Sequence, residues 1–178
     1  MFKRFIATFT AVFFLITIFP LALTKRAYAY QNNSYFNDLR VWLTSMSAAT
    51  ATVTLNGGYT LNGQTYPAGT VFNLGINGTS VTLNGVLHSQ ISIVPNDKSS
   101  LLTLTSASIS NKYMGSFIFK IFNGKILPIN MIDMENYLKG VVGYEMSDYF
   151  PIEALKAQTV AARNYALSRI GWESAKGY

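Results

Sequence analysis

The residues of this chain that are best suited to chemistry lie in one stretch near its C-terminal end, MENYLKGVVGYEMSDYFPIEALKAQTVAARNYAL, residues 134–167. A single acid, Glu145, stands there between two runs with helical spacing, and the aromatic residues Tyr144, Tyr149 and Phe150 surround it in the sequence. Apolar surroundings raise the pKa of a carboxyl group, because loss of water disfavours the charged form. A carboxyl group tuned in this way can serve as a general acid near neutral pH. Residue types alone leave two interpretations of Glu145 open, a solvated surface acid and a general acid.

Two further polar residues, Gln158 and Arg163, stand in the alanine-rich run that follows. Their separation of five residues places them about 140° apart on a helix that turns ~100° per residue, so they do not share one face. Each is either a solvated surface residue or reaches back toward Glu145 to hold a carboxylate or sugar hydroxyl groups. Composition by itself favours the surface interpretation. Asp148 is the weaker candidate for a second catalytic acid.

Other site chemistries find little support. The chain has no cysteine and one histidine, His88. A disulfide framework and a thiolate zinc site are therefore excluded, and one histidine cannot form a metal site unaided. No Ser-His-Asp set and no glycine-rich phosphate loop can be proposed. We expect no metal and no cofactor, and a structural or surface role for His88.

The region before this stretch, residues 30–132, has the pattern of a β domain. From Leu39 onward, short runs alternate apolar and polar residues with period two, as in ATVTLN and SFIFKIF. Asn-Gly pairs, which favour tight hairpin turns, recur between these runs, at Asn56, Asn62, Asn77, Asn84 and Asn123. These features predict a small antiparallel sandwich or barrel of hairpins.

The period then becomes helical over residues 133–178. One short amphipathic helix is expected to begin near Met134 and to be interrupted at Gly143, and a longer one to run from Pro151 to Gly171. The bend between them would hold Glu145. The fold class predicted for the whole chain is α+β, with the β-rich half first and the two helices after it.

The first residues predict export. Lys3 and Arg4 precede a charge-free apolar run, and Ala27-Tyr28-Ala29 matches a secretory cleavage pattern, so residues 1–29 are interpreted as a signal peptide. An uncleaved N-terminal membrane anchor is the alternative, because the run approaches a bilayer-spanning length. Four of the 14 Lys and Arg residues precede Ala29, which leaves 10 against eight acids. A net charge of +2 gives no electrostatic footprint for nucleic acid, so DNA or RNA binding is not expected.

The stretch 134–167 resembles the signature of the stage II sporulation protein D family, also called the amidase-enhancer (LytB-type) domain. The resemblance rests on the YL-x-GVV run, the Glu-Met pair and the motif EALKAQ-x-VAAR-x-YAL. It implies an exported lytic transglycosylase that cleaves peptidoglycan glycan strands in bacterial cell-wall remodelling. By this resemblance Glu145 falls on the catalytic acid, Arg163 on an arginine needed for full function, and Gln158 on the glutamine of KAQ. Cell-wall amidases or other sporulation wall hydrolases are the protein partners that the family implies.

Domains of this family continue past the long helix with a further β-rich segment, whereas this sequence ends at Tyr178. We therefore expect residues 133–178 to be the helical N-terminal part of an incomplete catalytic core. Three functions remain open on these grounds. They are a peptidoglycan-cleaving enzyme, a non-catalytic wall-binding or amidase-stimulating module, and an inactive truncated fragment.

Overall fold

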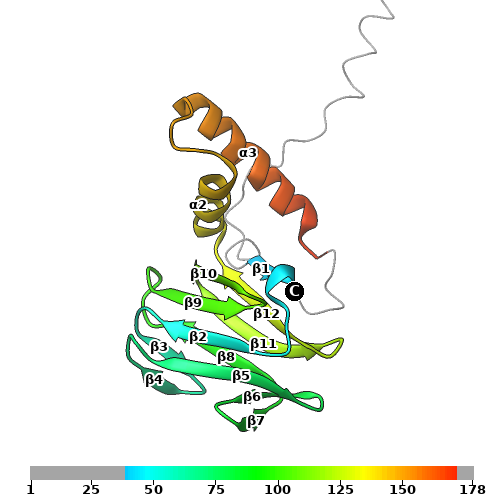
Figure 1. Ribbon diagram of the computed structural model, residues 1–178. Helices are drawn as coiled ribbons and strands as arrows, with labels where there is room; N and C mark the ends of the chain where they lie inside the picture. The colour runs from blue at the N-terminus through cyan, green and yellow to red at the C-terminus, as the bar shows by residue number, and fades with distance from the viewer. Residues whose placement is uncertain (1–38, 172–178) are drawn as a thin grey trace, which may run out of the picture. The chain divides into compact units, whose positions relative to one another are not determined.

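The structure, a computed structural model, describes residues 39–171 (Figure 1). The proposed signal segment, residues 1–29, lies outside this range. The strands are β1 (Leu39–Trp42), β2 (Ala51–Leu55), β3 (Tyr59–Leu61), β4 (Gln64–Tyr66), β5 (Val71–Asn77), β6 (Ser80–Leu83), β7 (Val86–His88), β8 (Ile91–Pro95), β9 (Leu101–Ser106), β10 (Ile109–Met114), β11 (Ser116–Phe122) and β12 (Lys125–Ile132). The helices are the 3₁₀ turn η3 (Thr44–Met46), α2 (Met134–Glu145) and α3 (Ile152–Arg169). Neither α2 nor α3 combines the length and the apolar character that crossing a membrane would require.

The strands form two six-stranded antiparallel sheets, in the orders β1-β12-β11-β8-β3-β4 and β10-β9-β2-β5-β6-β7. The two helices follow the last strand. The predicted α+β class is confirmed, and of the two predicted architectures the structure has the two-sheet form.

Alternation of side chains explains why these segments pair as sheets. In β2, for example, Ala51, Val53 and Leu55 are buried while the threonines between them are half-buried. Buried residues of both sheets, including Phe72, Leu104, Phe117 and Phe119, form one apolar core. Such a core supplies most of the driving force for folding.

Asn-Gly pairs turn three of the hairpins as predicted. The pairs at Asn62, Asn84 and Asn123 have positive φ at both residues, the conformation that a two-residue hairpin turn of the favoured hand requires. The pair Asn56-Gly57 differs, because neither residue has a positive φ. This pair connects β2 in one sheet to β3 in the other. It therefore lies in a connection between the two sheets and does not close a hairpin.

One loop with a sequence of mostly small residues is partly buried. The segment 45–50 consists mostly of serine, alanine and threonine, as surface loops often do, but its Met46 is only 1% exposed and belongs to the core between the sheets. The turn η3 directs the Met46 side chain inward. The polar residues on both sides of Met46 give no sign of this burial in the sequence.

A second, smaller apolar cluster joins the helices to the sheet that contains β1 and β12. Its buried members are Leu39, Ile132, Met134, Leu138, Ala162 and Ala166. Asp133 links β12 directly to α2 and caps the helix, because its side chain accepts a hydrogen bond from the backbone N–H of Asn136 at 2.9 Å. The strand therefore ends where the helix begins, and the cluster fixes both helices against the strands.

Candidate functional site

Glu145 is the last residue of α2, not part of a loop. The predicted interruption at Gly143 is absent, since the helix continues through this glycine. An exposed helical glycine costs only about 1 kcal/mol relative to alanine, so the rest of the helix can overcome it. The bend between the helices is shorter than predicted and begins at Met146, and Pro151 stands just before α3 as its N-terminal cap residue.

Gln158 of α3 contacts Glu145 directly. Its side-chain nitrogen Nε2 donates a hydrogen bond to Glu145 Oε2 at 2.5 Å. The functional interpretation of Gln158 requires such a contact, and the contact lies on the exposed surface of the two helices. A carboxyl oxygen and an amide thus meet on two neighbouring helices.

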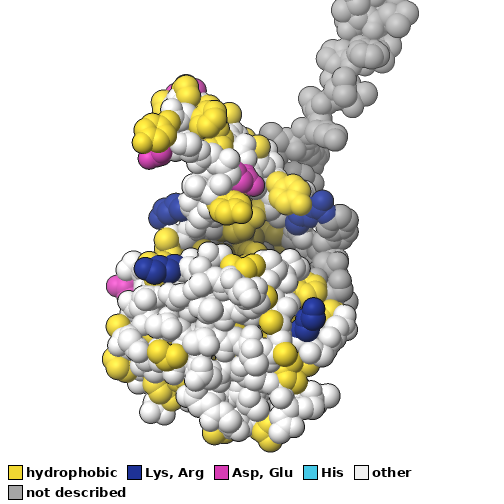
Figure 2. Space-filling view, in the orientation of Figure 1, with side chains coloured by type: hydrophobic (Ala, Val, Ile, Leu, Met, Phe, Trp, Pro, Cys, Tyr) yellow, Lys and Arg dark blue, Asp and Glu magenta, His cyan; other side chains and the backbone are white. Residues whose placement is uncertain are grey.

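The aromatic residues around Glu145 do not bury it. Tyr144 is 93% exposed, Tyr149 is 94% exposed and Phe150 is 51% exposed, and Glu145 is itself exposed. Residues 39–171 therefore do not form the predicted apolar enclosure of the carboxyl group. Figure 2 shows hydrophobic side chains gathered on the surface of the helical region, where they face outward.

Arg163 contacts another carboxylate, that of Glu135 in the first turn of α2. Its Nη1 donates to Glu135 Oε1 at 2.6 Å and its Nη2 donates to Glu135 Oε2 at 2.9 Å. This two-point contact holds the pKa of the Glu135 carboxyl group below its usual value, chiefly through the hydrogen bonds from Arg163. Arg163 thus contacts the first turn of α2, and Glu135 is a residue that sequence reasoning missed.

The alanines of α3 explain how both polar residues reach α2. Ala162 and Ala166 are buried against α2 and β1, and such small residues allow two helices to approach closely. Gln158 lies roughly 40° to one side of Ala162 and Arg163 roughly 100° to the other, at ~100° per residue. The two residues therefore flank the contact face. Their predicted separation of faces was right, and it places them on the two sides of one interface.

Tyr137 is a second residue that the sequence did not single out. Burial raises the pKa of its phenol group, and the negative charges of Glu145 and Tyr165 raise it further. The phenol group of Tyr137 is thus half-buried beside the helix contact and within electrostatic reach of Glu145.

The remaining candidates lie apart from this pair. Asp148 is exposed in the bend and accepts a 3.4 Å hydrogen bond from the neighbouring Ser147. His88 is half-buried at the end of β7, in a sheet that carries neither helix.

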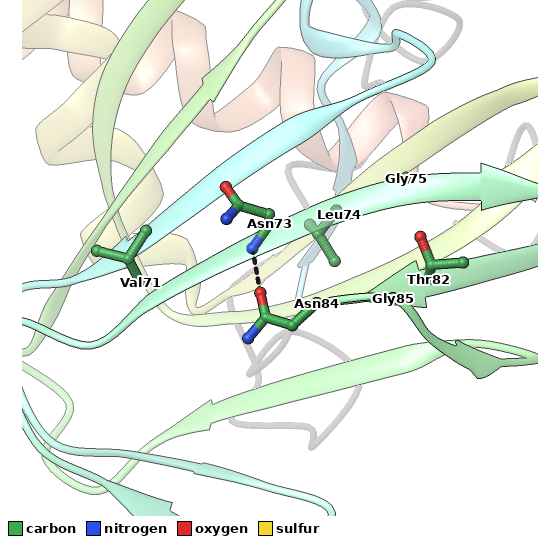
Figure 3. A pocket seen from close by; sticks show the side chains of 7 residues that line it. All are labelled: Val71, Asn73, Leu74, Gly75, Thr82, Asn84 and Gly85. Carbon is green, nitrogen blue, oxygen red and sulfur yellow. Dashed lines mark hydrogen bonds between the residues drawn. The ribbon is translucent and has the colours of Figure 1, made fainter.

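A shallow hollow of about 670 Å³ lies on the sheet face between β5 and β6 (Figure 3). Its lining is uncharged: Val71, Asn73, Leu74, Gly75, Thr82, Asn84 and Gly85. Asn84 turns its side chain to the backbone, since its Oδ1 accepts from the N–H of Asn73 at 2.8 Å. This side chain extends the pairing of the two strands, so its role here is structural.

Comparison with known proteins identifies the helical region. Residues 122–178 match the SpoIID family, described as stage II sporulation protein. The match begins at the last residue of β11 and includes β12 and both helices. It confirms the resemblance that residues 134–167 carry.

A longer relative matches more of the chain. An uncharacterized protein of Brachyspira hyodysenteriae (strain ATCC 49526 / WA1) is 33% identical over 146 residues, which is 80% of this chain. The chain spans only 38% of the length of that relative. No solved structure matches the chain.

Proposed function

We propose, because residues 122–178 belong to the SpoIID family of stage II sporulation proteins, that this protein acts on peptidoglycan glycan strands as a lytic transglycosylase. Membership in the family indicates a sporulation-related function at the cell wall, and the enzymatic activity is the further step proposed here. The observation that carries it is the hydrogen bond between Gln158 and Glu145, which gives the candidate acid a defined partner within the matched region.

The reaction needs one carboxyl group. Ordinary glycosidases use two, one as acid and one as base or nucleophile. In a lytic transglycosylase the muramic acid residue supplies the nucleophile, its own 6-hydroxyl group. Glu145 would donate its proton to the leaving glycosidic oxygen as the bond from that oxygen to C1 breaks. The Glu145 carboxylate would then take the proton of the 6-hydroxyl group while the oxygen of that hydroxyl group bonds to C1. The product is a 1,6-anhydro ring formed without water.

The partner of Glu145 suits this exchange of protons. An amide carries both donors and an acceptor, so Gln158 can donate to the carboxylate or accept from the protonated carboxyl group. A cation in the same place would favour the charged form and oppose protonation. In this structure Arg163 of the same helix contacts Glu135, and the neutral amide of Gln158 contacts Glu145.

The test is incubation of the protein with glycan strands stripped of stem peptides, followed by mass spectrometry for anhydromuramyl ends. Wild-type protein is expected to produce them, and Glu145→Gln, which keeps the shape but has no exchangeable acid proton, is expected to reduce the rate at least about 100-fold. Asp148→Asn is the matched control and should retain activity, because this carboxylate has no role in the proposed reaction. Absence of anhydro ends with wild-type protein, or full activity of Glu145→Gln, would refute the proposal.

A non-catalytic role in wall binding or amidase stimulation is the second candidate. It is favoured by the outward-facing rings of Tyr144 and Tyr149, which are more than nine-tenths exposed. Large exposed apolar groups gathered on one surface are typical of interaction sites. In this case the protein would co-sediment with purified cell walls or raise the turnover of a wall amidase, and Glu145→Gln would leave both unchanged. Replacing both tyrosines with serine would abolish them.

Both functions require the protein to reach the wall, so we also propose export through residues 1–29, with release or membrane anchorage at the outer surface. Expression in a bacterial host followed by N-terminal sequencing of the exported fraction tests this. A new N-terminus at Tyr30 indicates cleavage after Ala29, whereas an intact N-terminus in the membrane fraction indicates an anchor. Retention of the whole protein in the cytoplasm would contradict export.

A further inference from the structure

The ion pair between Glu135 and Arg163 joins residues 28 positions apart and connects the first turn of α2 to the middle of α3. Both carboxylate oxygens accept from different nitrogens of the guanidinium group, at 2.6 and 2.9 Å. The planar fork of arginine fixes direction as well as distance, which a single contact does not. Exposure of the two side chains is 28% for Arg163 and 63% for Glu135.

A pair this exposed contributes little to stability. Exposed ion pairs are typically worth about 0–1 kcal/mol, because water screens them and ordering two long side chains costs entropy. The pair is therefore better suited to determining geometry than to holding the fold together.

The apolar part of the interface leaves room for such a role. Leu138, Ala162 and Ala166 are buried where α2 and α3 meet. Alanine side chains set how closely the helices approach, but they offer few protrusions that would prevent one helix from rotating or sliding on the other. The larger side chains Tyr137, Val141 and Leu167 pack around them only partly buried, and directional contacts at the margins of the interface add restraint.

Contacts of this kind join α2 and α3 toward opposite ends of α2. Glu135 and Glu145 are ten residues apart, which is about 15 Å along a helix. Glu135 is held by Arg163 and Glu145 by Gln158, on either side of the alanine contact. A helix held at two separated points cannot rotate at one point without disturbing the other.

We propose that Glu135 and Arg163 form a positioning pair that fixes α2 on α3 and so places Glu145 against Gln158. The proposal deepens the function proposed above and rests on it for its catalytic consequence. Neither residue is a catalytic residue, because both act through the placement of Glu145.

The contact itself can be observed by NMR without any activity. The side-chain amide signals of Gln158 in ¹⁵N-labelled protein are assigned by their disappearance in Gln158→Ala. The Glu145→Gln variant then gives the chemical shift of these signals when the Glu145 carboxyl group is no longer there to accept the hydrogen bond. Glu135→Gln and Arg163→Gln are each expected to move the signals toward that position. Restoring a reversed pair with Glu135→Arg and Arg163→Glu together should return them toward the wild-type position.

The matched control is Glu153→Gln. Glu153 pairs with Lys156 within α3 at 2.8 Å, on an exposed part of the helix. This substitution removes an ion pair of the same chemistry that does not connect the two helices, so it should leave the Gln158 signals in place. Unmoved signals in Glu135→Gln and Arg163→Gln, or equal movement in Glu153→Gln, would overturn the proposal.

The kinetic arm follows on denuded glycan strands. Glu135→Gln is expected to lower kcat by about 10- to 100-fold with little change in KM, since displacement of a catalytic group by about 1 Å can have an effect of this size. Arg163→Lys, which keeps the charge and loses the fork, should fall between wild type and Arg163→Gln. If wild-type protein cleaves no glycan, the proposed function fails while the NMR arm still decides whether the pair positions Glu145. A rise in KM at constant kcat would instead assign Arg163 to substrate binding and refute the positioning role.

Discussion

Replacement of Tyr59 by phenylalanine should make the protein less stable at neutral pH and more stable than wild type in alkali. Tyr59 is fully buried in the core between the sheets, and its hydroxyl group donates a hydrogen bond to the backbone carbonyl of Ser100 at 3.0 Å. Burial raises the pKa of this phenol group to about 12. The folded protein therefore keeps the proton under conditions in which the unfolded chain, with a tyrosine pKa near 10, releases it.

The size of the effect follows from linkage. Titration of Tyr59 leaves the free energy of unfolding of wild type unchanged below about pH 10. As pH rises from about 10 to 12 this free energy falls, by up to ~2.7 kcal/mol for a pKa difference of about two units. Tyr59→Phe has no proton to lose and forgoes only the hydrogen bond, at a cost of ~1 kcal/mol. The two stability curves should therefore cross where the loss in wild type reaches ~1 kcal/mol, near pH 10.6.

Urea denaturation followed by circular dichroism at pH 8, 10 and 11 measures both curves. Tyr149→Phe is the control, because this ring is 94% exposed and the substitution removes no buried hydroxyl group. Its stability difference from wild type should be small at every pH tested. A difference between wild type and Tyr59→Phe that stays constant across this range would show that the phenol group titrates normally and would refute the reasoning.

Three further predictions concern the glycines, the helical cluster and the ion pair. Gly115→Ala should lower the free energy of unfolding in urea by at least about 2 kcal/mol, because Gly115 has φ +91° and an added Cβ would lie against a backbone oxygen of β12. Gly143→Ala, where the added Cβ would meet open space on α2, should raise it by about 0.5–1 kcal/mol. Equal effects of the two substitutions would contradict this prediction. Leu138→Ala should lower the free energy of unfolding by about 2–4 kcal/mol, and in hydrogen exchange the amides of the helices should lose protection before those of the strands. In Leu104→Ala, a variant of the core between the sheets, the amides of helices and strands should lose protection together. The same exchange pattern in the two variants would refute a separate helical cluster. The pKa of Glu135 is lowered in the folded protein, so its ion pair contributes up to ~1 kcal/mol of stability above about pH 4.5 and loses this contribution as pH falls below that value. Glu135→Gln should therefore be less stable than wild type at pH 7 but not at pH 3. A difference in stability that persists at pH 3 would contradict the lowered pKa.

The β half shows what local sequence can and cannot predict. Asn62-Gly63, Asn84-Gly85 and Asn123-Gly124 specify their turns because few other residues adopt positive φ at little cost. The turn between β9 and β10 has positive φ at Ala107 and Ser108, which no propensity would suggest. Strand order was also beyond prediction, since β2 pairs with β5 and β9 and not with β3, the next strand in the chain. Such pairings depend on tertiary packing, which local patterns do not encode.

The candidate site divides in the same way. The family resemblance around Glu145 could be obtained from the sequence, and so could the placement of Gln158 and Arg163 on different faces of one helix. The residue of α2 that each of them contacts could not be predicted, because it depends on how α3 returns antiparallel along α2. Glu135 was therefore overlooked, because a carboxylate in the first turn of a helix is already explained by its favourable interaction with the helix dipole. The enclosure expected from the aromatic residues failed because neighbours in sequence at a helix end need not be neighbours of the same side chain in space.

The exposure of Glu145 bears on both proposed functions. A general acid works best in surroundings from which water is excluded, and the described residues leave this carboxyl group open to solvent. Water must therefore be displaced by whatever binds there, and the exposed rings of Tyr144 and Tyr149 offer apolar surface that a sugar ring or a protein surface could cover. A glycan strand that covered these rings would bring its own glycosidic oxygen toward the acid, whereas a protein partner would cover them and leave the acid without a substrate. Catalysis and binding thus make different demands on the same few residues: only catalysis requires that Gln158, and the pair formed by Glu135 and Arg163 behind it, hold Glu145 in one place.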